Sequence, residues 1–171
     1  MVLIRLPALK MKGYTLIELL VTITIVVLVS GLSLSGYLIY NESRLLDIDA
    51  KNLNSELGKI RSKAVFLEYP SLCTGLTSYA VSSDLDIDGQ RKNIKYTANC
   101  NSGTLESVVV SVLKSSVFLA DFSLVFAAQT GYLDPNENVD ILIRSEKGNQ
   151  KTMKVTVNKL VSSLNVSTNE E

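Results

Sequence analysis

The chain contains no histidine and no tryptophan among its 171 residues. Histidine is the commonest general base and metal ligand near neutral pH, so its absence argues against most acid–base and metal-dependent enzymes. The sequence also contains no glycine-rich phosphate loop and no nucleophile elbow. These absences predict a protein that is not an enzyme.

An excess of positive charge is also missing, because 17 Lys and Arg residues balance 17 Asp and Glu residues. Three of the cations, Arg5, Lys10 and Lys12, precede the main apolar run and leave 14 basic against 17 acidic residues after them. Sequence-independent binding to nucleic acid depends on a broad basic surface. We therefore do not expect a nucleic-acid partner.

A long uncharged run follows these cations and extends from Leu19 to Asn41. A helix of more than about twenty residues, rising 1.5 Å per residue, crosses a hydrocarbon core of about 30 Å. The run therefore predicts one membrane span. The cations before it place the N-terminus in the cytoplasm by the positive-inside rule, and the rest of the chain outside.

One carboxylate, Glu18, stands at the head of this run. A carboxylate in lipid costs about 2.5–3.5 kcal/mol even on the lenient insertion scale, so Glu18 is expected to have a partner. A cleavable secretory signal does not carry such a residue at the start of its apolar region, and no small-x-small cleavage site follows the run. Cleavage before the span fits the sequence better.

The run Gly13-Tyr14-Thr15-Leu16-Ile17-Glu18-Leu19-Leu20 closely resembles the processing site of type IV pilins and of the pseudopilins of type II secretion. The resemblance implies that a prepilin peptidase cuts after Gly13 and methylates the new terminal amine on Tyr14. It also implies that Glu18 neutralises that amine on a neighbouring subunit. The implied partners are other subunits, the peptidase and an inner-membrane assembly platform. An ordinary single-span anchor with a chance glutamate is the alternative.

We expect four segments: a leader at residues 1–13, a transmembrane and filament-core helix at 14–40, an amphipathic helix at 41–69 and a β-rich domain outside the membrane at 70–171. The amphipathic segment has apolar residues at alternating steps of four and three, which predicts one buried helix face. These positions are Leu46, Ala50, Leu53, Leu57, Ile60, Ala64 and Leu67. The residues between them, Asp47, Asp49, Lys51, Asn54, Glu56, Lys59, Arg61 and Lys63, should form a solvated face.

After Pro70 the sequence changes to short β-like runs separated by turn signals. The expected strands are Tyr79–Leu85, Asn93–Ala98, Leu105–Leu113, Val117–Ala127, Val139–Ile143, Met153–Val157 and Leu160–Val166. The expected fold is α+β and pilin-like, with the long helix packed on an antiparallel β-sheet domain of five to seven strands and a frayed acidic tail from Val166. The order of elements resembles minor pseudopilins of the GspH/FimT type.

Cys73 and Cys100 are the only cysteines, and both lie in the part expected outside the membrane. An even count in an exported domain favours a disulfide, which would contribute about 3 kcal/mol in the chain-entropy model. Two reduced thiols are the alternative.

Asp84, Asp86 and Asp88 have the D-x-D-x-D-G spacing of a calcium loop. The twelfth position is Lys95 rather than a bidentate glutamate, which weakens the match. The alternative is a plain Asp-Gly hairpin in which Leu85 and Ile87 face the core. Structural calcium is therefore a candidate, and no other cofactor is expected.

Two functions follow. The first is a structural subunit, a minor pilin or minor pseudopilin, that joins a filament through its N-terminal helix; a major subunit is the nearest variant. The second is a single-span surface domain that binds calcium or a glycan and does not polymerise. The sequence does not say whether the machine serves secretion, adhesion, motility or DNA uptake.

Overall fold

The computed structural model describes residues 15–68, 70–105, 107–134, 137–147, 151–158 and 165–167, with the backbone alone for 32–35 and 165–167. The chain divides into two compact units, Met1–Leu38 and Ile39–Glu171. One helix, α1 (Leu16–Val65), extends from the first unit into the second. Gly13 and Tyr14, the expected processing site, lie outside the described residues.

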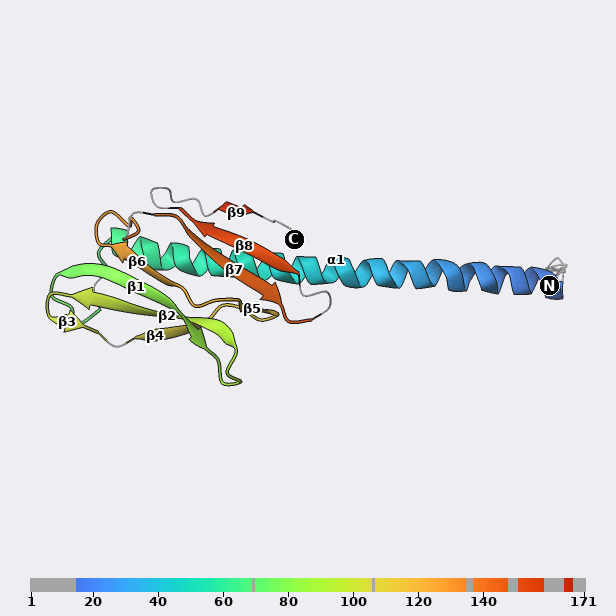
Figure 1. Cartoon of the computed structure of the whole chain (residues 1–171), viewed down its shortest axis with the longest axis horizontal. Helices are drawn as coiled ribbons and strands as arrows, with labels where there is room; N and C mark the ends of the chain where they lie inside the picture. The colour runs from blue at the N-terminus through green and yellow to red at the C-terminus, as the bar shows by residue number, and fades with distance from the viewer. Residues whose placement is uncertain are drawn as a thin grey trace, which may run out of the picture. The chain divides into compact units, whose positions relative to one another are not determined.

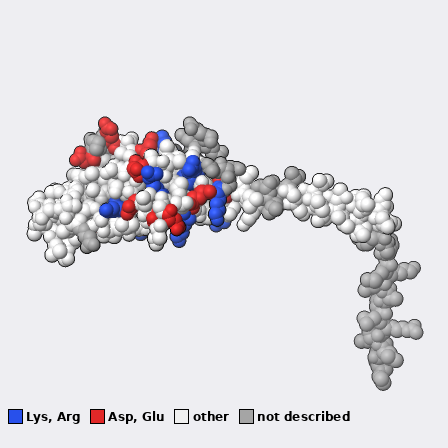
Figure 2. Space-filling view, turned by 60° about the horizontal axis from the view of Figure 1, so that its bottom comes forward, with Lys and Arg blue, Asp and Glu red and all other residues white. Residues whose placement is uncertain are grey.

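The described part of the first unit is the beginning of α1. Most of its side chains are apolar and exposed, and Leu16 and Ile17 expose 83% and 72% of their area. By length and composition this helix is able to cross a membrane. Figure 2 shows the helix before Asn41 without a coloured charge on the visible face. The exposed apolar surface fits a helix made for lipid or for other helices.

In the second unit, the rest of α1 buries one face against β-sheets (Figure 1). The six predicted apolar positions within the helix are each at most 2% exposed, so the periodic pattern identified the buried face correctly. They are Leu46, Ala50, Leu53, Leu57, Ile60 and Ala64. The helix ends at Val65, and Leu67 follows in the left-handed region with φ 54° and remains partly buried.

Nine strands lie within the described residues, in two antiparallel sheets, which confirms the predicted α+β layout with more strands than the five to seven expected. The first sheet has the order β3-β2-β1-β6, with β4 also paired with β2, and the second has the order β5-β7-β8-β9. The bounds are β1 (Leu76–Leu85), β2 (Arg91–Cys100), β3 (Gly103–Thr104), β4 (Val108–Ser111), β5 (Ser116–Phe118), β6 (Ser123–Ala127), β7 (Val139–Ser145), β8 (Thr152–Val157) and β9 (Asn165–Ser167).

The predicted strand Val117–Ala127 is wrong as a single element, because the chain leaves one sheet and enters the other within it. β5 pairs with β7, and β6 pairs with β1. Asp121 holds the corner between them, accepting hydrogen bonds from Arg91 at 2.6 and 3.1 Å and from the Ser83 hydroxyl at 3.1 Å. A largely apolar run does not reveal such a corner, because one half packs in the second sheet and the other half in the first.

The second sheet shows the expected alternation along β8. Met153, Val155 and Val157 are buried, and Val155 and Val157 expose none of their area. The frayed tail predicted for Val166–Glu171 is corrected only at its beginning, because Val166 and Ser167 lie in β9, which pairs with β8; residues 168–171 lie outside the described residues. The predicted strand Leu160–Val166 lies partly outside the described residues. Inward-facing residues of both sheets and of α1 form one core.

Asp49 contradicts the prediction of a solvated helix face, because it is only 2% exposed. Its carboxylate accepts hydrogen bonds from the backbone N–H of Lys114 at 3.2 Å, from that of Ser115 at 2.8 Å and from the Ser116 hydroxyl at 2.8 Å. These donors lie where the chain passes from β4 to β5, that is, from one sheet to the other. Asp49 therefore ties α1 to this crossing.

Acid is expected to weaken one cross-strand contact of the second sheet. Asp140 on β7 accepts from the Thr156 hydroxyl at 2.7 Å and the Lys154 ammonium at 2.9 Å, and these bonds hold the pKa of its carboxyl below the ordinary 3.8. A depressed folded pKa stabilises the fold above the unfolded pKa of about 3.9, and that contribution disappears as the pH falls. The stability lost between pH 7 and pH 3 should therefore be smaller in Asp140→Asn than in the parent. The difference should stay below about 1 kcal/mol, because the site is exposed and solvent screens the charges. Urea unfolding at pH 7 and pH 3 measures the difference, and an unchanged pH dependence would contradict it.

Candidate functional site

The first candidate site is the beginning of α1, where Thr15 and Glu18 form part of a capping box. The backbone N–H of Glu18 donates to the Thr15 hydroxyl oxygen at 3.3 Å. This is the Ncap-to-N3 bond of the S/T-x-x-E pattern, which satisfies one free donor at a helix start. The sequence signal for this cap is the run Thr15-Leu16-Ile17-Glu18, which has the capping-box spacing.

Glu18 itself is exposed, with no cation of the described residues in ion-pair contact. A carboxylate in the first turn interacts favourably with the partial positive charge of the helix start. In water the Glu18 carboxylate stays solvated and needs no further partner. Inside lipid or a packed helix bundle, the interaction with the helix start offsets only a small part of the cost of desolvating the carboxylate. Glu18 is therefore an anion that a cation from another chain can reach.

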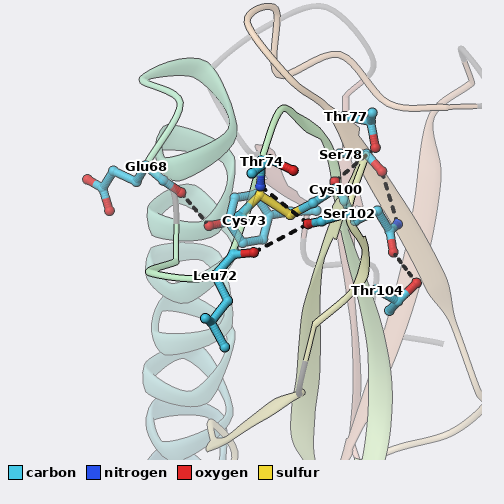
Figure 3. The surroundings of a disulfide bond; sticks show 11 residues. Glu68, Leu72, Cys73, Thr74, Thr77, Ser78, Cys100, Ser102 and Thr104 are labelled. Atoms are coloured by element: carbon cyan, nitrogen blue, oxygen red, sulfur yellow. Dashed lines mark hydrogen bonds between the residues drawn. A yellow bond between two sulfur atoms is a disulfide. The ribbon is translucent and has the colours of Figure 1, made fainter.

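The second candidate is the end of the second unit where the disulfide lies. Cys73 and Cys100 are joined, with their Cα atoms 5.6 Å apart, which confirms the predicted bridge. The bridge connects the segment after α1 to the end of β2 (Figure 3). Ser102 adds to this connection, since its hydroxyl donates to Leu72 O at 3.3 Å and accepts from the backbone N–H of Thr74 at 3.3 Å.

Removing the bridge is expected to destabilise the second unit by about 3 kcal/mol, because the closed loop, with a sequence separation of 27, restricts the unfolded chain. The double variant Cys73→Ser/Cys100→Ser should unfold at lower urea than the parent. Adding reductant should lower the parent to the same midpoint and leave the variant unchanged. A reductant effect on the variant would show that something other than this bridge is being measured.

The acidic turn between β1 and β2 carries Asp86 and Asp88, with Asp84 at the end of β1. One oxygen of Asp86 accepts the backbone N–H groups of Asp88 at 2.8 Å and Gln90 at 3.1 Å, so this carboxylate shapes the turn. Across the residues that the structure describes, no group of three or more His, Cys, Asp or Glu side chains is placed to hold a metal ion. Calcium binding here stays a prediction.

The inward orientation expected for Leu85 and Ile87 in the alternative hairpin is wrong. Leu85 exposes 54% of its area and Ile87 exposes 105% of its reference value. The hairpin extends past the end of the helix-facing core, so its alternation has nothing to pack against.

On the face shown in Figure 2, Lys and Arg are interspersed with Asp and Glu and form no continuous basic patch.

Comparison with known families agrees with the geometry at the start of α1. The model of the prokaryotic N-terminal methylation motif matches residues 9–34, which include Gly13, Tyr14 and Glu18. No curated protein and no solved structure matches the chain. On a pilin-like α+β fold, at the head of a helix long enough to span a membrane, the chain thus carries the methylation motif that is the signature of type IV pilins and pseudopilins.

Proposed function

We propose that this chain is a minor pilin or minor pseudopilin, a structural subunit that is cut after Gly13 and joins a filament through α1. The methylation motif at residues 9–34 is the observation that carries the proposal. The exposed apolar surface of α1 before Asn41 supports it, since such a surface serves first in lipid and then against other helices. The second unit would then form the outer surface or the tip of the filament.

In this function the peptidase creates a new terminal amine on Tyr14. Glu18 of one subunit would meet that amine on its neighbour as the helices pack. An ammonium and a carboxylate in an apolar environment are each costly alone, whereas the pair removes most of the cost. The pair would therefore set the axial register of one helix against the next.

The intact mass and N-terminal sequence of the protein from its native membrane or sheared surface fraction test the proposal. We expect a chain beginning at N-methylated Tyr14. A chain that retains Lys12 and Gly13 in cells with active peptidase would overturn it. The better account would then be a single-span surface domain, binding calcium or a glycan, that does not polymerise.

The role of Glu18 is separable from its capping contact. Glu18→Gln keeps a side chain that suits the capping box but removes the charge, so it should leave the helix intact and lower filament yield by about tenfold or more. Thr15→Ser keeps the cap and the charge and should assemble normally. Sheared-filament yield, compared with total membrane protein, measures both variants. Normal assembly of Glu18→Gln would show that the charge sets no register.

A further inference from the structure

The turn between β1 and β2 presents an aliphatic side chain that nothing in the described part of the chain covers. Ile87 is fully exposed at its apex, beside the exposed Asp88. The turn is well held, because Asp86 accepts two backbone N–H groups within it and donates its own N–H to Gln90 O at 2.7 Å. Gly89 adopts φ 74°, which glycine permits without strain. Because the turn is already ordered, its insertion into a partner would cost little conformational entropy.

A cavity of about 420 Å³ lies between the end of α1, the segment that follows it and the first sheet. Its size is within the range that receives a side chain or a small ligand. Apolar and polar atoms both contribute to the walls, and Leu72 among them exposes 78% of its area. The lining residues are Lys63, Glu68, Pro70, Ser71, Leu72, Tyr79, Tyr96, Ala98, Leu105 and Val108.

Glu68 and Lys63 are the charged residues that line this cavity, and the cation is the ammonium of Lys63. It lies over the Tyr96 ring, 5.4 Å from the centroid, and pairs with no carboxylate among the described residues. Glu68 turns its carboxylate away from the disulfide, and its backbone carbonyl accepts the Tyr79 hydroxyl at 2.7 Å (Figure 3). The Lys63 ammonium therefore favours a carboxylate from a partner on its side of the cavity, next to the apolar residues of the lining.

We propose that the β1–β2 turn of one copy occupies this cavity in a second copy, with Ile87 against the apolar residues of the lining and Asp88 beside Lys63. Asp88 of the turn and Lys63 of the cavity carry opposite charges, and the cavity would cover the exposed side chain of Ile87. The two features lie toward opposite ends of β1 (Figure 1), a strand of ten residues that extends about 33 Å. Such a contact is head-to-tail, so it can be repeated from subunit to subunit, as a filament requires.

This contact rests on the proposed filament function, because a filament places copies of the chain next to one another. A single inserted turn is small, and by itself it would hold two free domains only weakly. Copies anchored in one membrane or one filament meet at high effective concentration, where a weak contact is enough. The contact would thus add to the packing of α1 and set how neighbouring domains are rotated.

Cysteine cross-linking in native membranes tests the contact on the full chain. Both native cysteines are in the disulfide, so added cysteines are the reactive ones. Cells producing Ile87→Cys together with Leu72→Cys should give, on oxidation, about tenfold or more mixed dimer than cells producing Leu142→Cys with Leu72→Cys. Leu142 on β7 exposes 44% and is the matched control. Equal yields from the two pairs would overturn the contact.

Charge reversal separates the contact from damage to the fold. Adding Lys63→Glu to the Leu72→Cys copy should lower the mixed dimer about tenfold, and adding Asp88→Lys to the Ile87→Cys copy should restore it. An unchanged dimer in Lys63→Glu would overturn the contact. The N-terminus is read on the same membranes: a chain cut before Tyr14 that gives no mixed dimer refutes the contact alone, and an uncut chain that gives the dimer refutes the filament function alone.

Discussion

Replacing Gly13 with leucine is expected to stop processing of the precursor and with it all filament formation. Glycine leaves the bond after it free of a side chain, so the backbone can approach a protease closely. Leucine adds a branched side chain at that bond. The chain should accumulate in the membrane with its leader attached and without N-methylation, as shown by intact mass and by the absence of protein in the sheared fraction.

Gly31→Leu is the matched control, because it makes the same substitution within the span. A Cβ added at Gly31 meets no atom within 4 Å, and leucine is the better helix former by about 1 kcal/mol. This variant should be cut normally. If Gly13→Leu were also cut and methylated, the assignment of the processing site to Gly13 would be wrong.

Replacing Asp49 with alanine is expected to lower the free energy of unfolding by about 4 kcal/mol, the largest effect that we expect from a substitution in the second unit. The backbone donors of Lys114 and Ser115 would stay buried without their acceptor, and each such loss costs about 1–3 kcal/mol. The acceptor is also a carboxylate, which forms the stronger charge-assisted bonds. A stretch that changes sheets has no ladder of its own to replace them.

Urea unfolding of the full chain in detergent, followed by tyrosine fluorescence, measures this loss. Asp47→Ala is the control two residues away, because Asp47 forms only an exposed pair with Lys51 and should change stability by less than about 0.5 kcal/mol. Asp49→Asn should fall between the two, since its amide oxygen still accepts one donor. Equal stability of Asp49→Ala and Asp47→Ala would mean that the crossing between sheets is held by other contacts.

Much of the molecule followed from patterns that are local in the sequence. The span required only an unbroken apolar run, and the buried face of α1 required only apolar residues at the helical period, which Leu53 and Leu57 satisfy. The methylation motif is a short continuous run, and the family model matches it at residues 9–34. Pairing of Cys73 with Cys100 was predicted from the even number of cysteines and their expected position outside the membrane, and the structure confirms the disulfide.

The contacts that the prediction missed depend on which segments meet in three dimensions. Asp49 looked like one acid of a solvated face, and it is buried only because a stretch 65 residues later places its N–H groups there. The division of Val117–Ala127 between two sheets likewise depends on its partners, since β5 pairs with β7 and β6 pairs with β1. Neither partner can be read from local periodicity.

The sequence by itself determined the N-terminal motif, the span, the helix face and the β-rich class, because each is set by spacing along one segment. Only the tertiary structure decided that there are two sheets, that Asp49 is a buried anchor, and that Ile87 is exposed while a cavity with Lys63 stands open near the other end of the first sheet. The physical reason is that burial and hydrogen bonding are shared between segments distant in sequence, so one segment alone does not specify them.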